Sequence, residues 1–121
     1  PGQAVSEGPW TVVVADVQRG QSFGKHVADD GVLVLVEVDI TNTTANTYSV
    51  ETKDFSLTDG ESFTVALVGD DDYTPVATIE PDSTKRLRPV FFVPAFIAER
   101  DLTFVFQNAA SGIVRIEVPL P

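Results

Sequence analysis

Three consecutive carboxylates, Asp70, Asp71 and Asp72, form the densest group of side chains in the sequence that could hold a metal ion. Ca²⁺ requires about six to eight oxygen ligands from a loop that curls around the ion. Consecutive residues project in diverging directions, and no D-x-D-x-D-G spacing follows, so a site here would recruit carboxylates from a neighbouring loop, such as Asp29 or Glu80. Two interpretations stay open, a calcium site and a solvated acidic turn, and the sequence favours the turn.

A second cluster carries positive charge. Lys85, Arg86 and Arg88 are three of the eight basic residues and lie within four positions. On a strand, Arg86 and Arg88 share one face and Lys85 points to the other. Such a cluster either pairs with carboxylates of the neighbouring strand and protects a sheet edge, or binds an anionic group of a partner. The sequence favours the pairing, with partner binding as the functional alternative.

The sequence contains no recognisable catalytic constellation. His26 is the only histidine and there is no cysteine, so a zinc site of histidine and cysteine cannot be built within the chain. Ser22 is four residues from His26, but no Gly-x-Ser-x-Gly motif is present to expose a nucleophile. We therefore expect no enzymatic activity and no cofactor.

Aromatic and glycosylation signals have structural interpretations. Trp10 opens a strand, and Tyr48 and Tyr73 lie near expected loops. Exposed aromatic side chains would favour contact with carbohydrate or protein, but we expect Trp10 to pack in the core, where tryptophan is mostly buried. Asn42-Thr43-Thr44 matches an N-glycosylation sequon and is interpreted as turn chemistry.

Composition limits the class of partner. The chain has 121 residues, 43% of them apolar, with 18 acidic and 8 basic residues and a net charge of −10. This charge repels nucleic-acid phosphates and anionic lipid headgroups, so neither is an expected partner. The longest apolar run, Val32–Val36, is far shorter than the roughly 18 residues of a membrane-spanning helix. A protein or another component of the cell envelope is the expected partner.

These side chains must be positioned by strands. The strongest pattern is Gly31–Asn42, in which Val32, Val34, Val36, Val38 and Ile40 share one face at period two. Its other face changes from apolar, at Leu33 and Leu35, to charged, at Glu37 and Asp39, as in a central strand of a sandwich. Further strands are expected over residues 10–17, 54–58, 62–68, 76–79, 83–93, 102–106 and 112–118, with a short one near Tyr48 and Val50.

Turn signals separate these strands. Asp59-Gly60 predicts a hairpin, Glu80-Pro81 predicts a turn, and Pro89 confines its strand to an edge or a bulge. Residues 94–100 have the composition of a single helical turn. The pattern predicts an all-β fold, an immunoglobulin-like antiparallel sandwich of about seven to nine strands over residues 10–121. Residues 1–9 are interpreted as a linker or tail.

Several spaced elements together resemble a known family. They are the long strand that ends in Ile40-Thr41-Asn42-Thr43, the segment Asp54–Gly60, the turn Ile79–Ser83, the run Phe91-Phe92-Val93-Pro94, and Leu102-Thr103-Phe104. In this order they resemble the telokin-like domains of unknown function found in exported lipoproteins of Gram-positive and related bacteria. The resemblance spans roughly residues 10–118, rests on structural motifs, and brings no active-site residues with it.

The resemblance implies an exported domain at the cell surface. Members of that family usually have a lipid-anchored cysteine upstream of the domain, which this chain does not contain, so lipidation is left open. We therefore expect an extracellular, non-enzymatic binding or interaction module. A Ca²⁺-binding surface domain is the first alternative and a hydrolytic enzyme the last.

Overall fold

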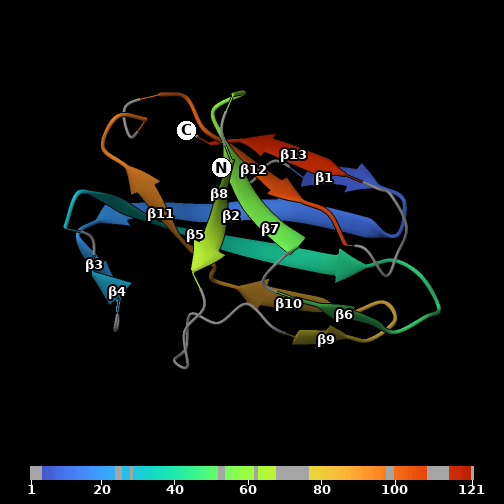
Figure 1. Cartoon of the computed structure of the whole chain (residues 1–121). Helices are drawn as coiled ribbons and strands as arrows, with labels where there is room; N and C mark the ends of the chain where they lie inside the picture. Colours follow the sequence, from blue (N-terminus) through green and yellow to red (C-terminus); the bar gives the residue numbers. More distant parts are fainter. Residues whose placement is uncertain are drawn as a thin grey trace.

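The computed structural model describes residues 4–23, 26–27, 29–51, 54–61, 63–67, 77–97, 100–108 and 115–120. In this part of the chain the regular structure is built from strands (Figure 1), and no helix is long and apolar enough to cross a membrane. The strands are β1 (Ala4–Glu7), β2 (Trp10–Gly20), β3 (Ser22–Phe23), β4 (His26–Val27), β5 (Gly31–Asn42), β6 (Tyr48–Val50), β7 (Phe55–Thr58), β8 (Phe63–Leu67), β9 (Ala77–Ile79), β10 (Thr84–Leu87), β11 (Val90–Pro94), β12 (Thr103–Phe106) and β13 (Ile116–Pro119).

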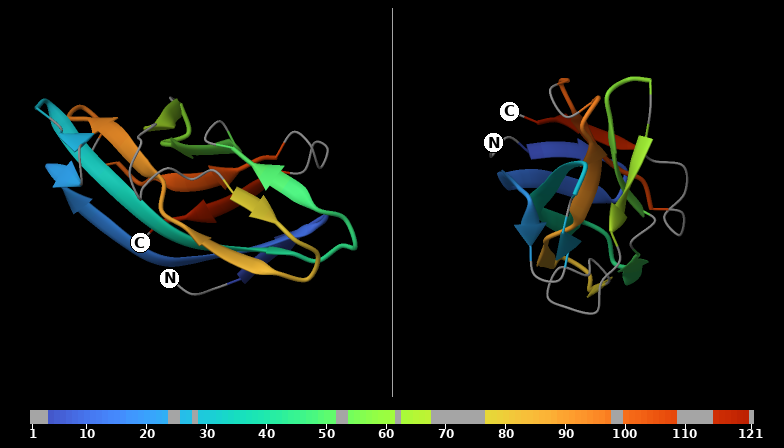
Figure 2. Two further views of the ribbon diagram at one scale, coloured as in Figure 1. Left: turned by 90° about the horizontal axis from the view of Figure 1, so that it is seen from below. Right: turned by 60° about the vertical axis from the view of Figure 1, so that its left-hand side comes forward.

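Nine of these strands form one continuous antiparallel sheet that folds over into two layers. Its order is β1-β2-β5-β11-β8-β7-β12-β13, with β10 also paired to β5. The bend falls where β11 passes from β5 to β8, so β1, β2, β5 and β10 lie in one layer and β7, β12 and β13 in the other (Figure 2). Two short ladders, β3–β4 and β6–β9, are the other strand pairs in the described part of the chain. The predicted all-β antiparallel sandwich is confirmed.

Strand β5 is the central element, and its register follows the predicted alternation. Val34, Val36, Val38 and Ile40 are at most 1% exposed and face the space between the layers. On one edge β5 pairs along its length with β2, interrupted by a bulge between Val14 and Asp16. Its other edge pairs with β11 over the first half and with β10 over the second.

Proline accounts for the division of that second edge. The sequence pattern predicts one strand over residues 83–93, whereas the structure separates β10 from β11 at Arg88 and Pro89. Pro89 has no N–H to give to a ladder, but its carbonyl accepts a hydrogen bond from Val36 N at 3.0 Å. The predicted placement of Pro89 at an irregularity is therefore confirmed.

A group of aromatic side chains lies among the aliphatic residues of the core. Phe55, Phe91, Phe104 and Phe106 are each at most 1% exposed, and Trp10 joins them with its ring centroid 5.2 Å from that of Phe106, edge to face. A smaller cluster of Leu33, Leu35 and Val90, with Phe92 packed against it, lies on the opposite face of β5 and β11.

Two segments differ from the pattern expected from the sequence. Residues 4–7, expected in a tail, form β1 against β2, because Gly8 takes a positive φ of 56° and, with Pro9, closes a two-residue hairpin. Residues 95–97 form a hydrogen-bonded turn in place of the expected helical turn, since Ile97 N bonds to Pro94 O at 3.1 Å. Ile97 is then buried in the main core.

Candidate functional site

Arg86 in β10 is engaged by two carboxylates of β5. Its Nε and Nη2 donate to the two oxygens of Asp39 at 2.8 and 2.9 Å, and Nη1 donates to Glu37 Oε1 at 2.8 Å. These hydrogen bonds and the positive charge of Arg86 lower the pKa of Asp39, against an opposing contribution from burial. The same contacts raise the pKa of Arg86. The guanidinium therefore serves a cross-strand ion pair.

The other two basic residues of the cluster are not brought to the same place. Lys85 lies opposite Ile40 in the ladder, on the other face of the sheet from Arg86, as the period of a strand predicts. Arg88 lies in the break between β10 and β11. Both side chains are exposed, so the three residues do not form one basic patch.

The predicted metal ligands Asp70, Asp71 and Asp72 lie outside the described residues, and so does Tyr73. Within the part of the chain that the structure describes, no group of three or more metal-binding side chains is close enough to hold an ion. The backbone of His26 pairs with that of Phe23, and Ser22 pairs with Val27. The calcium site stays a prediction.

Trp10 is a core residue, as expected from its type. It is 1% exposed, and its ring centroid lies 5.4 Å from that of Tyr48, which is half-buried in β6. The ring of Trp10 is therefore not available to a ligand, and the ring of Tyr48 packs against it.

Asn42 performs the turn chemistry predicted for it. It is fully buried, and its Oδ1 accepts hydrogen bonds from Thr44 N at 3.0 Å and Thr44 Oγ1 at 2.8 Å. Its Nδ2 donates to the carbonyls of Asn46 and Ile79, at 2.6 and 3.1 Å. Since the amide has no exposed surface, the sequon is used inside the fold, where it joins the end of β5 to β9.

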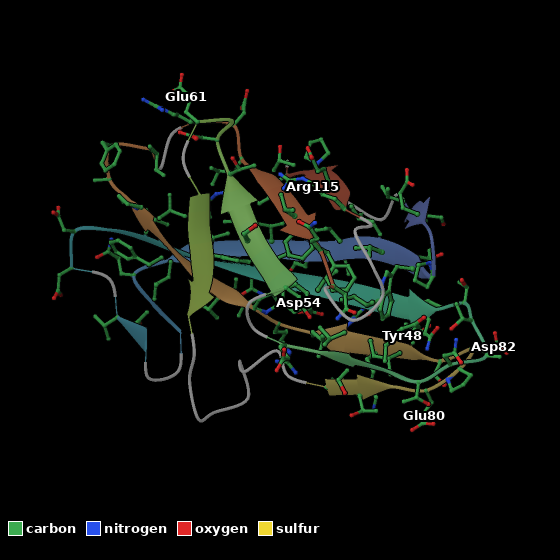
Figure 3. The ribbon with its side chains drawn as sticks, turned by 45° about the vertical axis from the view of Figure 1, so that its right-hand side comes forward. Tyr48, Asp54, Glu61, Glu80, Asp82 and Arg115 are labelled. Atoms are coloured by element: carbon green, nitrogen blue, oxygen red, sulfur yellow. The ribbon has the colours of Figure 1, made fainter. Side chains whose placement is uncertain are left out.

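A buried polar pair, Asp54 and Asn108, was not singled out by its sequence. Asp54 Oδ2 accepts hydrogen bonds from Asn108 Nδ2 and from Glu51 N, both at 2.8 Å. Asn108 Nδ2 also donates to Ser49 O at 2.8 Å. Asp54 lies where the chain enters β7 (Figure 3). The pair joins residue 108 to the segment 49–54, more than 50 residues earlier in the chain for each of the two bonds of Asn108, so only long-range contact could reveal it.

The turn after β11 carries an exposed aromatic side chain. Phe96 is 75% exposed, and among the described side chains it and Val27, at 67%, are the large hydrophobic residues left open to solvent. The next residue, Ile97, is 2% exposed and anchors the turn in the core. Sequence reasoning missed Phe96. The available signal was two adjacent large apolar residues after Pro94, of which only one can face inward in a tight turn.

An ion pair fixes the other side of this turn. Arg100 N bonds to Ile97 O at 3.1 Å, and Arg100 Nη1 donates to Asp59 Oδ2 at 2.7 Å and to Glu61 Oε2 at 3.4 Å. Asp59 and Glu61 lie at the tip of the β7–β8 hairpin, where the predicted Asp59-Gly60 turn is confirmed and Gly60 has a φ of 95° (Figure 3). The side chain of Asp59 is fully buried in this contact. Phe96 is thus presented on a turn that is held at both sides.

The sequence matches a family described as Domain of unknown function (DUF4352) over residues 1–113. No curated protein matches it significantly.

Solved bacterial structures share the fold at low sequence identity. The yjhA protein of Bacillus subtilis matches with a TM-score of 0.77 at 15% identity, over 99% of this chain and 97% of that one. The candidate lipoprotein ycdA of Bacillus subtilis matches with a TM-score of 0.78 at 18% identity, over 97% of this chain, which spans only 38% of ycdA. An uncharacterized β-sandwich protein from Clostridium difficile matches with a TM-score of 0.60 at 13% identity, over 99% of this chain and 91% of that one.

Proposed function

Because the chain belongs to the DUF4352 family of domains of unknown function, we propose its role from its surface: it is a non-enzymatic module that binds a protein partner through the turn that carries Phe96. The observation that carries this proposal is the 75% exposure of Phe96 in a fold that buries its other described aromatic side chains wholly or in part. Large aromatic side chains are rare on open surfaces and frequent at the centres of interfaces.

The fixed geometry of the turn supports a binding role. Ile97 is held by the core and Arg100 by the β7–β8 hairpin, so Phe96 sits on a backbone that is ordered before any partner arrives. Association is opposed by the loss of conformational freedom, and a pre-ordered contact residue reduces that loss.

The two described groups with a shifted pKa, Asp39 and Arg86, form a structural ion pair, which fits the proposed non-enzymatic role. Active sites shift pKa values by burial and by carboxylate or histidine neighbours inside a cleft. Here the pKa of Asp39 is lowered by Arg86 on the open face of β5 and β10, in an ion pair that serves the sheet.

Export is the second part of the proposal. The fold similarity to the candidate lipoprotein ycdA and the resemblance to telokin-like domains of exported lipoproteins support a place at the bacterial cell surface. The full-length gene product tests this part. A signal peptide with a lipid-anchored cysteine upstream of Pro1 is the expected finding, and a cytosolic start directly before Pro1 would contradict it.

Binding is tested with the purified, fluorescently labelled domain and a cell-envelope fraction from Bacillus subtilis. We expect saturable binding that is lost after the envelope has been treated with protease. Phe96→Ala should weaken it about tenfold, the effect of removing one buried aromatic contact. Phe96→Leu is the matched control, because it keeps an apolar side chain, and it should retain most of the binding.

The fold of each variant is checked by its unfolding temperature, which should stay unchanged because Phe96 makes little contact with the core. Equal binding by the wild-type domain and Phe96→Ala would refute the proposed site. Binding that survives protease treatment would refute a protein partner.

A further inference from the structure

The surroundings of Phe96 indicate the chemistry of the partner, and we infer that it presents a hydrophobic side chain flanked by lysine or arginine. This inference rests on the proposed function, and it adds the sign of the partner's charge and the residues that select it.

Strand register brings an acidic pair next to Phe96. Gly31, the first residue of β5, lies directly opposite Pro94, the last residue of β11. The segments just outside this pair, Asp29-Asp30 on one strand and Ala95-Phe96 on the other, therefore leave the sheet side by side. Both aspartates and Phe96 are exposed. We call this surface, Asp29, Asp30, Ala95 and Phe96, the Phe96 end.

The entry to the β3–β4 ladder is tied to the same place. Gln21 Nε2 donates to Gly31 O at 3.1 Å, so the chain that leads into β3 is held at the start of β5. The other exposed large apolar side chain, Val27, belongs to β4, which lies away from the end of β11 (Figure 1), so it is not part of this surface. The Phe96 end thus combines one large apolar side chain with two carboxylates.

A close contact sets the spacing of the two strands at this end. A Cβ at Gly31 would lie 2.4 Å from Val93 O and 3.0 Å from the ring of Phe92, so β5 and β11 approach each other as closely as glycine permits. The positions of Asp30 and Ala95 follow from this contact rather than from a long loop.

The charge balance around the Phe96 end is negative. The described acidic residues at this end and on the adjoining hairpin and turn outnumber the basic ones, Arg19 and Arg100. Arg100 is held by Asp59 and Glu61. In sequence, Lys25 and Glu99 also fall in these segments, and their charges cancel. The acidic residues are Asp29, Asp30, Asp59, Glu61 and Asp101.

The apolar and acidic side chains of the Phe96 end together indicate which class of partner can bind. An apolar centre with a carboxylate rim is complementary to an apolar side chain with a cationic rim, and like charges opposed across an interface cost affinity. A second copy of this chain, with its net charge of −10, and an anionic lipid surface both bring the wrong sign. A basic protein segment meets both requirements.

The test uses three hexapeptides and the isotope-labelled domain, with binding followed through its backbone amide resonances. The first peptide is Lys-Lys-Leu-Phe-Lys-Lys, the second replaces the lysines with glutamate, and the third replaces the apolar pair with serine. We expect the first to shift the resonances of residues 29–31 and 95–97 most strongly. The second should leave them unchanged, and the third should bind at least about threefold more weakly than the first.

Variants of the domain separate the local charge from the overall charge. Asp29→Ser/Asp30→Ser removes two carboxylates from the Phe96 end. Glu80→Gln/Asp82→Asn removes two exposed carboxylates from the distant β9–β10 turn (Figure 3) and leaves the same net charge. We expect the first double variant to lose at least about threefold in affinity for the lysine peptide, and the second to bind like the wild type.

Each other outcome overturns the inference. If both double variants weaken the peptide equally, the attraction is non-specific. If the glutamate peptide binds as well as the lysine peptide, the inferred positive charge of the partner is wrong. If no peptide shifts the resonances of residues 95–97, the inference that a basic segment binds there is refuted. A size that grows with domain concentration and depends on Phe96 would assign the surface to self-association. Envelope binding that needs Phe96 but ignores Asp29 and Asp30 would refute only this inference and leave the proposed function standing.

Discussion

At the residue scale, buried side-chain amides join segments that the backbone ladders leave separate. Asn108 bridges Ser49 and Asp54, and Asn42 bridges Asn46 and Ile79. A buried polar group whose partner is removed has given up its hydrogen bonds to water and has none in the protein, which lowers the stability of the fold. Both asparagines should therefore matter more for stability than their exposed neighbours.

Asn108→Ala leaves the Asp54 carboxylate buried without its amide donor. We expect the free energy of unfolding to fall by about 2 kcal/mol, measured by urea denaturation. Gln107→Ala is the control, because that side chain is exposed and only its backbone N–H bonds to Asp54 O. Equal losses in the two variants would show that the Asp54–Asn108 bond contributes nothing.

Asn42→Ala should release the loop that follows β5. The expected loss is about 1–3 kcal/mol, with faster amide hydrogen exchange at Thr44 and Asn46. Asn46→Ala removes an exposed side chain and keeps the carbonyl that Asn42 uses, so it should leave stability unchanged. Unchanged exchange in Asn42→Ala would contradict the role given to this residue.

The Arg86–Asp39 pair should make the stability of the fold depend on pH in the acidic range. The pKa of Asp39 is lower in the folded chain than in the unfolded one, so its contribution is complete above the unfolded value of about 3.9. That contribution is lost as the pH falls through the lower folded pKa. The unfolding temperature of Arg86→Ala should therefore lie below that of the wild type at neutral pH, and the difference should shrink below pH about 4.

Titration of Asp39 by NMR gives a direct measurement. Its pKa should rise in Arg86→Ala and stay the same in Arg115→Ala, whose guanidinium pairs with Glu117 instead. An Asp39 titration that is identical in all three proteins would rule out Arg86 as the cause of the shift.

At the element scale, the close approach of β5 and β11 is the tightest constraint. Gly31→Ala would place a methyl group against Val93 O, so a strand must move, and we expect a loss of about 1–3 kcal/mol. At Gly60 there is open space, and the positive φ of 95° makes alanine cost only about 1 kcal/mol. Unfolding by urea should rank the two variants in that order, and the reverse order would contradict the contact.

At the scale of the whole molecule, the net charge of −10 opposes folding through self-repulsion. Raising NaCl from about 10 mM to about 150 mM shortens the screening length roughly threefold or more, so the unfolding temperature should rise. A fall over this range would show that attractive pairs such as Arg86–Asp39 dominate the electrostatic energy.

Calcium distinguishes the two interpretations of Asp70–Asp72. An ion that binds only the native state raises the unfolding temperature. We expect CaCl₂ to have the same effect as NaCl of equal ionic strength, and EDTA to have none, as for a solvated acidic turn. A rise specific to Ca²⁺ that is lost in Asp71→Asn would establish the metal site instead.

The sequence by itself determined the elements whose pattern is local. The alternation in Val32–Ile40 selected β5 and its buried face, because period two in β-branched residues leaves little other choice. Asp59-Gly60 and Pro89 marked a hairpin and a break for the same reason, since turn geometry and a missing N–H are properties of those residues alone.

Only the tertiary structure decided what faces what. The exposure of Phe96 beside a buried Ile97, the bonding of Asn108 to Asp54, and the capture of Arg86 by Asp39 depend on which strands become neighbours. These contacts join segments that are separated by dozens of residues, and a local sequence pattern does not predict such contacts. For the same reason, the acidic surface beside Phe96 formed only where β5 begins and β11 ends.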